Sequence, residues 1–222
     1  MNTLGDLSNQ RVAGIYGRVT RPPSKLALAL KRLTDFVVSA ALLIMFMPLL
    51  LAIGITVKVT SPGPVLYRWP VVGKGGRPLS AHKFRSMVVG ADGMKRELWH
   101  RNEATGPVFK IRNDPRVTPV GRVLRKFSLD ELPQLWNVLK GDMSLVGPRP
   151  VLSYEWEHFS EWHRRKLSVK PGIVSLWHLR GQPRDFDTWV RLDLEYIDNW
   201  SIWLDFRLLA WVVVYTLTGR NY

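Results

Sequence analysis

The chain has 222 residues, enough for one domain with a buried core of ordinary size, with or without a membrane element. Its 32 Lys and Arg residues exceed its 18 Asp and Glu residues, and the formal net charge of +14 favours anionic partners: nucleic acid, acidic lipid head groups or phosphorylated substrates. The absence of cysteine excludes disulfides, thiolate catalysis and cysteine-based metal sites.

The N-terminal residues 1–24 are polar, lack hydrophobic periodicity and end in Arg21, Pro22 and Pro23, so we predict a flexible tail. They do not resemble a secretory signal, because polar residues such as Asp6 and Arg11 interrupt any apolar core.

An uncharged segment of 22 residues, 36–57, follows. As a straight helix it would reach about 33 Å, enough to cross a hydrocarbon core of about 30 Å. Pro48 lies near its middle and predicts a break, and basic residues stand on both sides, Lys31 and Arg32 before it and Lys58 after it. Because cationic flanks prefer the cytoplasmic side, we favour a re-entrant hairpin; a kinked span and a buried soluble helix remain alternatives.

Residues 65–72 and 82–87 have the pattern of strands, separated by the loop 73–78, and residues 88–104 are typical of a polar helix. Strand alternation would place Lys83 and Arg85 on one face. The alternative role for these two cations is an exposed basic edge that discourages aggregation.

The stretch 128–150 combines an acidic pair, Asp130 and Glu131, with a helical pattern that stops at Gly141, a residue suited to a left-handed C-cap. The apolar positions at helical spacing are Leu132, Leu135, Trp136 and Leu139. A basic run precedes the pair, comprising Arg122, Arg125 and Lys126. Since a helix N-terminus favours anions, we predict that the pair and the run share an anion site.

The acidic pair also has a purely structural interpretation. Ser128 and Glu131 match the spacing of a capping box, which would explain Glu131 without catalysis. Alternatively, Asp130 could be the N-cap of a helix that has Pro133 in its first turn.

Beyond Pro150, residues 151–168 are predicted to form an amphipathic helix, either in a membrane interface or packed on the domain. Residues 173–179 read as a strand, and residues 189–217 as helix with a break near 199–201. The last apolar run, 208–217, is too short to span a membrane.

Other catalytic motifs are missing from the sequence. It contains no H-E-x-x-H, no G-x-S-x-G, no P-loop and no G-x-G-x-x-G. Nucleophilic catalysis would therefore fall to a carboxylate, which can attack phosphoryl groups when a hard divalent cation and cationic side chains hold the phosphates. Asp130, Glu131, Arg149 and the basic run supply these residue types.

Over nearly the whole chain from about Lys25, the sequence resembles the bacterial sugar transferase family, the monotopic polyprenyl-phosphate phosphoglycosyl transferases. The resemblance rests on the basic residues before the Pro-broken segment and on four motifs: KFRSM at 83–87, NDPRVTPVGRVLRKFSLDELPQLWNVLKGDMSLVGPRP at 113–150, VKPGI at 169–173 and LDLEYIDNWSIWLD at 192–205. The long central motif is the most specific of them.

The resemblance implies an enzyme that transfers a sugar 1-phosphate from a nucleotide diphosphate sugar to polyprenyl (undecaprenyl) phosphate and so initiates polysaccharide or glycoconjugate synthesis. Asp130 would be the nucleophile that forms a covalent phosphosugar intermediate, and Glu131 would assist as metal ligand or base. Mg²⁺ is the implied cofactor, with Asp130 and Glu131 as its ligands. Phosphate binding is expected at Arg149, with Lys83 and Arg85 as helpers and Arg125 from the basic run.

The expected architecture is α+β and mainly helical, membrane-associated and monotopic, with a Pro-broken re-entrant helix, a small β element and interfacial amphipathic helices. We expect a flexible tail at 1–24, the re-entrant helix at 25–60 and a catalytic domain at 61–222 on the cytoplasmic face of the bacterial inner membrane. Membrane lipids are expected partners and nucleic acid is not; a homo-oligomer stays open. The alternative function is a non-catalytic membrane scaffold of a glycan-assembly complex.

The sequence departs from the family pattern at three places. Met47 replaces the Ser that usually precedes the breaking Pro, and Ser86 replaces the usual Thr of the first motif. The loop 174–182 departs more, with His178 and Leu179 near an expected Gln, and Gln182 where Arg is usual. If this loop reads the nucleotide or the sugar, the departures alter specificity or reduce activity.

Overall fold

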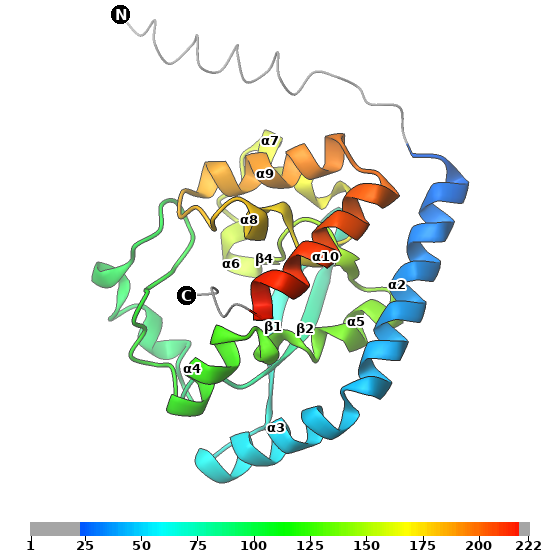
Figure 1. The fold of residues 1–222 in the computed structure, drawn as a ribbon. Coiled ribbons are helices and arrows are strands. Elements are labelled where there is room, and N and C mark those ends of the chain that lie inside the picture. The colour runs from blue at the N-terminus through cyan, green and yellow to red at the C-terminus, as the bar shows by residue number, and fades with distance from the viewer. Residues whose placement is uncertain (1–22, 218–222) are drawn as a thin grey trace, which may run out of the picture.

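The computed structural model describes residues 23–217. The tail predicted for residues 1–24 therefore lies outside the described residues, except for Pro23 and Ser24. The predicted α+β, mainly helical class is confirmed: helices surround a small sheet in Figure 1.

Two long helices form the first part of the fold and run along one side of the molecule (Figure 1). Helix α2 (Lys25–Met45) starts at Ser24, whose hydroxyl accepts a hydrogen bond from the Ala27 amide at 3.1 Å. Helix α3 (Met47–Thr60) follows at an angle of 63°, with Pro48 in its first turn, where proline is tolerated. Among the described helices none is by itself long and apolar enough to cross a membrane, but the bent pair together is.

A three-stranded antiparallel sheet lies at the centre of residues 61–217, the main body of the fold. Strand β1 (Leu66–Val72) pairs with β2 (Pro78–Phe84) across the short turn η1 (Lys74–Gly76), and β4 (Val151–Leu152) pairs with the other edge of β1. A second, parallel pair joins β3 (Ser144–Val146) to β5 (Gly172–Val174). This pair joins the segment after α5 to the segment before α8.

The remaining helices surround these strands (Figure 1). In chain order they are η2 (Gly93–Lys95), η3 (Trp99–Arg101), α4 (Pro119–Lys126), η4 (Leu129–Glu131), α5 (Gln134–Lys140), α6 (Ser153–Trp156), α7 (Glu161–Arg164), η5 (Arg165–Ser168), α8 (Leu176–Leu179), α9 (Phe186–Asp198) and α10 (Ile202–Leu217). The break predicted near 199–201 is confirmed by the gap between α9 and α10.

Three predicted elements are corrected. The helix predicted over 88–104 is reduced to the short turns η2 and η3, and the strand predicted over 173–179 ends at Val174. The amphipathic helix predicted over 151–168 is broken into β4, α6, α7 and η5. Local side-chain bonds explain the breaks: Glu155 accepts from the Leu152 amide at 3.0 Å, and His163 Nδ1 accepts from the Ser160 amide at 3.1 Å, so each starts a new helix.

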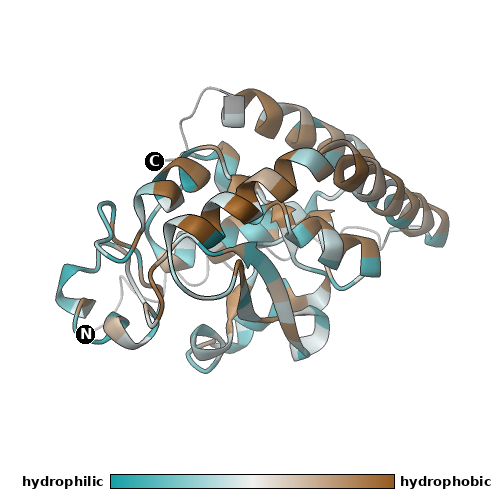
Figure 2. Ribbon diagram, turned by 90° about the horizontal axis from the view of Figure 1, so that it is seen from below, coloured by the Kyte–Doolittle hydropathy of each residue, from teal (hydrophilic) through white to brown (hydrophobic). Residues whose placement is uncertain are grey.

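The bent helix pair is attached to the main body of the fold through a small apolar cluster. Ile53 and Val57 of α3 pack with Phe84 at the end of β2 and Leu124 of α4, and all four side chains are buried. The other faces of α2 and α3 expose large apolar side chains, including Leu26, Ile44, Leu51, Ile55 and Val59. Figure 2 shows hydrophobic residues along the helices and hydrophilic residues gathered on loops.

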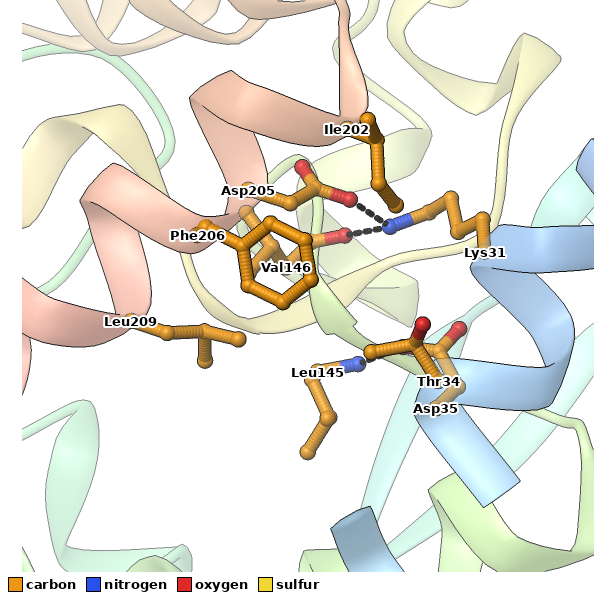
Figure 3. A pocket seen from close by; sticks show the side chains of 9 residues that line it. All are labelled: Lys31, Thr34, Asp35, Leu145, Val146, Ile202, Asp205, Phe206 and Leu209. Carbon is orange, nitrogen blue, oxygen red and sulfur yellow. Dashed lines mark hydrogen bonds and ion pairs between the residues drawn. The ribbon is translucent and has the colours of Figure 1, made fainter. Parts of the chain in front are cut away.

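The basic residues in α2 also bind the main body of the fold. Lys31 donates to Asp205 Oδ2 at 2.5 Å and to the Val146 carbonyl at 3.0 Å, across a small cavity between α2 and α10 (Figure 3). The Arg32 guanidinium donates to the Val138 and Leu139 carbonyls at the end of α5 at 2.7 and 2.8 Å. The charges before the hydrophobic segment therefore have a structural role besides any effect on membrane orientation.

Candidate active site

The acidic pair lies in the 3-10 turn η4, between α4 and α5. The predicted capping box is wrong: Ser128 is left-handed, with φ of 51°, and its side chain makes no cap bond to this turn. The alternative N-cap at Asp130 is also absent, because α5 begins at Gln134 with Pro133 in the cap position. The predicted left-handed cap at Gly141 is confirmed by its φ of 92°.

The buried face of α5 differs from the predicted one. Leu135 and Val138 are buried, whereas Trp136 is 52% exposed, because the helix begins later than expected and its inward face is rotated. Asn137 shares the buried face and donates to the Ser80 carbonyl of β2 at 2.8 Å. Helix α5 is therefore fixed against the sheet directly after the acidic pair.

Glu131 is bound by a cation from the sheet instead of by the helix. Lys83 of β2 donates to Glu131 Oε1 at 2.6 Å, and its ammonium lies 3.8 Å from the centre of the Trp69 ring. Both partners are partly shielded from solvent, with side-chain exposures of 16% for Lys83 and 26% for Glu131. A charge-assisted bond in such surroundings is stronger than one in open solvent.

The environment shifts the pKa values of the two carboxylates in opposite directions. Burial and the Glu131 charge raise the pKa of Asp130, although Lys83 and Arg125 oppose this. Burial also raises the pKa of Glu131, but the charge and hydrogen bond of Lys83, with a further contribution from the Arg149 charge, outweigh burial and lower it overall. Extra positive charge beside the pair would therefore favour the ionised form of Asp130.

Two predicted phosphate-binding arginines lie near the acidic pair. Arg125 of α4 donates through Nε to the Ser86 hydroxyl at 2.9 Å, and its charge opposes the rise in the pKa of Asp130. Arg149 lies over the indole rings of Trp177 and Trp189, at 4.8 and 5.1 Å from their centres.

The fourth predicted helper, Arg85, binds elsewhere. Its Nη2 donates to the Ser61 carbonyl at 2.9 Å and its Nη1 donates to the Pro62 carbonyl, in the turn after α3. Strand β2 ends at Phe84, so the alternation that placed Arg85 beside Lys83 stops one residue too early. The structure therefore brings together Lys83, Arg125 and Arg149, but it holds the two terminal nitrogens of the Arg85 guanidinium at the turn after α3.

The two carboxylates can hold a divalent cation only if the phosphates of the substrate supply further ligands. Within residues 23–217 no group of three or more His, Asp or Glu side chains could hold a metal ion. Mg²⁺, however, is commonly bound by one or two carboxylates plus substrate phosphates and water. Asp130 and Glu131 match this pattern, and the mutual charge that raises the pKa of Asp130 is what a divalent cation would offset.

Two residues close to the site were not among the predicted site residues. His178 of α8 lies near enough to Glu131 for the carboxylate to oppose the lowering of its pKa, and Lys110 lies 4.7 Å from the centre of the Trp177 ring. His178 had a signal in the sequence, since it stands near the position of an expected Gln. For Lys110 no pattern in the sequence singled it out.

The fold and the site together define a mainly helical unit with an acidic pair among cations, and the comparisons with known proteins agree with that class. The pattern that defines the bacterial sugar transferase family matches residues 26–219, so the chain belongs to this family.

Several curated relatives share extensive sequence with the chain. It is 45% identical over 190 residues to the undecaprenyl-phosphate galactose phosphotransferase of Salmonella typhimurium, covering 81% of this chain and 39% of the relative. It is 40% identical over 197 residues to the UDP-glucose:undecaprenyl-phosphate glucose-1-phosphate transferase of Klebsiella pneumoniae, covering 85% and 40%. It is 39% identical over 180 residues to the exopolysaccharide production protein ExoY of Rhizobium meliloti, covering 79% and 80%. The chain thus spans well under half of the first two relatives.

Proposed function

We propose that the chain is the catalytic unit of a phosphoglycosyl transferase, which moves a sugar 1-phosphate from a nucleotide diphosphate sugar to a polyprenyl phosphate and initiates polysaccharide synthesis. The observation that carries the proposal is the arrangement of Asp130 and Glu131 among Lys83, Arg125 and Arg149 in a member of the bacterial sugar transferase family. The names of two relatives support it: the Salmonella protein is an undecaprenyl-phosphate galactose phosphotransferase, and the Klebsiella protein is a UDP-glucose:undecaprenyl-phosphate glucose-1-phosphate transferase.

In the proposed reaction a carboxylate oxygen of Asp130 attacks the phosphorus that bears the sugar. The bond between that phosphorus and the bridging oxygen breaks, and its electron pair leaves with the nucleoside monophosphate. A phosphate oxygen of the polyprenyl phosphate then attacks the same phosphorus and frees the Asp130 carboxylate. Lys83, Arg125 and Arg149 hold the negative charge of the phosphates in place during both displacements.

The proposed cofactor is Mg²⁺, held by Asp130, Glu131 and the substrate phosphates. When bound it supplies positive charge that neutralises phosphate oxygens. Glu131 is suited to this role, because its lowered pKa keeps it ionised near neutral pH.

Turnover of nucleotide sugars tests the proposal. We expect the purified protein in detergent, with undecaprenyl phosphate and Mg²⁺, to release nucleoside monophosphate from at least one UDP-sugar of a panel and to label the lipid. A chelator should abolish release, and added Mg²⁺ should restore it. A protein that sediments with membranes but releases no monophosphate from any nucleotide sugar would be the non-catalytic scaffold instead.

We also propose that α2 and α3 form a re-entrant element in the bacterial cytoplasmic membrane, with the main body of the fold on its cytoplasmic face. Exposed apolar side chains along both helices and the 63° bend support this. So do the attachments of the two ends: the start of α2 binds through Lys31 and Arg32, and the end of α3 packs through Val57, onto the same main body of the fold. A kinked span would instead carry its ends to opposite sides of the membrane.

Single cysteines distinguish the two topologies, since the chain has none of its own. Lys25→Cys and Thr60→Cys place a thiol at exposed positions at the two ends of the pair, and Met45→Cys places one near the bend. In inside-out vesicles we expect a membrane-impermeant maleimide to label the two end positions and not Met45→Cys. Labelling of Lys25→Cys and Thr60→Cys from opposite sides of the membrane would contradict the re-entrant arrangement.

A further inference from the structure

Two cations beside the acidic pair approach the same aromatic ring. The Lys110 ammonium lies 4.7 Å and the Arg149 guanidinium 4.8 Å from the centre of the Trp177 ring. Lys110 belongs to the loop between η3 and α4, whereas Arg149 lies between Pro148 and Pro150, so distant parts of the chain bring the charges together. Both side chains are half-buried.

Neither charge makes a direct ion pair in residues 23–217, although the Arg149 guanidinium acts at longer range on the carboxylates of Glu131, Glu155 and Asp193. No hydrogen bond or ion pair is made there by the Lys110 ammonium or by the Arg149 guanidinium. Glu103, the carboxylate that acts on Lys110, already pairs with Arg184 and accepts from the Arg112 amide at 2.8 Å. Burial, followed by the charges of Arg149 and Arg184, lowers the pKa of Lys110 to about 8. The fold thus holds two neighbouring cations here without a direct ion-pair partner for either.

His178 adds a neutral donor to the two cations. Its Nδ1 lies 3.2 Å from the amide nitrogen, the hydroxyl and the carbonyl oxygen of Ser175; when it accepts from the amide, the neutral ring carries its proton on Nε2. Burial lowers the pKa of His178 to about 4, although Glu131 opposes this, and the ring is therefore neutral near pH 7. Within the described residues Nε2 has no hydrogen-bond partner.

We propose that Lys110, Arg149 and His178 form a subsite for the diphosphate of the donor, in which Lys110 binds the phosphate that leaves with the nucleoside. The inference rests on the proposed function for its class of substrate. When the bond to the bridging oxygen breaks, the leaving phosphate gains negative charge, and the Lys110 ammonium is placed to stabilise it. Arg149 and the Nε2 proton of His178 donate to phosphate oxygens nearer the acidic pair.

Binding of inorganic pyrophosphate tests the subsite independently of transfer. We expect Lys110→Met to weaken pyrophosphate binding, measured by calorimetry, by about tenfold or more, since one charge-assisted hydrogen bond is lost. Lys110→Arg should restore most of the affinity, because the charge returns. His178→Phe removes the donor and should weaken binding less, whereas His178→Gln, which keeps an N–H donor, should bind nearly as the natural chain does.

Lys140→Met is the matched control, because Lys140 is a 46% exposed lysine paired with Asp142 outside the site. Equal pyrophosphate affinity of Lys110→Met and Lys140→Met would overturn the subsite even if the protein transfers sugar phosphate. Conversely, the natural chain could show no transfer while Lys110→Met alone loses pyrophosphate affinity. That result would support the subsite and contradict the proposed function. Thermal unfolding of each variant verifies that the comparison is made on folded protein.

Discussion

Replacing Asp130 by asparagine should lower sugar-phosphate transfer by about a thousandfold or more and abolish the covalent phosphosugar adduct. The amide has nearly the shape of the carboxylate but is not a nucleophile. The fold should survive, because burial and the Glu131 charge already disfavour the Asp130 carboxylate, so a neutral group in its place costs little. Incubation with a nucleotide diphosphate sugar labelled in its sugar, followed by mass spectrometry of the intact protein, measures the adduct.

Glu131→Gln is the matched control for this experiment. It also removes one carboxylate, and it leaves Lys83 without its 2.6 Å ion-pair partner. We expect it to slow the reaction while still allowing the adduct to form on Asp130. An adduct that still forms on Asp130→Asn would assign the nucleophile to another residue. So would an adduct that survives hydroxylamine, because hydroxylamine cleaves an acyl phosphate.

The fold was predictable where short-range patterns decide it. The break at Pro48, strand β1, the left-handed Gly141 and the division between α9 and α10 all depend on residues within a few positions of each other. Predictions of helices failed where hydrogen bonds of single side chains outweighed the periodicity of the apolar residues. In 151–168 the helix starts at Leu152 and Ser160, each with a side chain three residues on that accepts from its amide, divide a pattern that, judged by its apolar spacing alone, is continuous.

The sequence singled out the acidic pair and the cations that lie near it, but not the contacts that these residues make. Ser128 and Glu131 have the spacing of a capping box, but the Glu131 carboxylate instead accepts a hydrogen bond from Lys83, 48 residues away in the sequence. No local rule anticipates that bond, since it depends on how β2 packs against η4. The same reasoning explains Arg85, whose position in the motif was clear and whose partners, the carbonyls of Ser61 and Pro62, became visible only in three dimensions.

The position of Arg149 depends on a buried ion pair that the sequence did not disclose. Asp193 of α9 accepts from the Arg149 amide at 3.0 Å through Oδ1, and its Oδ2 lies 2.6 Å from the Lys166 ammonium. Asp193 and Lys166 are only 1% and 4% exposed. Loss of one partner of such a pair leaves a charge buried without compensation, which costs about 3–5 kcal/mol.

We therefore expect Asp193→Ala to lower the free energy of unfolding by about 3–5 kcal/mol, a large part of the stability of a typical domain. Denaturant unfolding followed by Trp fluorescence measures this. Because Asn keeps an oxygen for the Arg149 amide and Met removes the Lys166 charge, the double variant Asp193→Asn with Lys166→Met should recover most of the loss. A coupling free energy below about 0.5 kcal/mol in the double-mutant cycle would contradict the pairing.

Activity separates the two roles of Asp193. Asp193→Asn with Lys166→Met retains the acceptor for the Arg149 amide, so we expect transfer close to that of the natural chain. Asp193→Ala with Lys166→Met also removes both charges but leaves that amide without its acceptor. If Asp193 positions Arg149, this second double variant should lose transfer by about tenfold or more while remaining folded, because a small displacement of a phosphate-binding group is costly. Equal activity of the two double variants would restrict Asp193 to stabilising the fold.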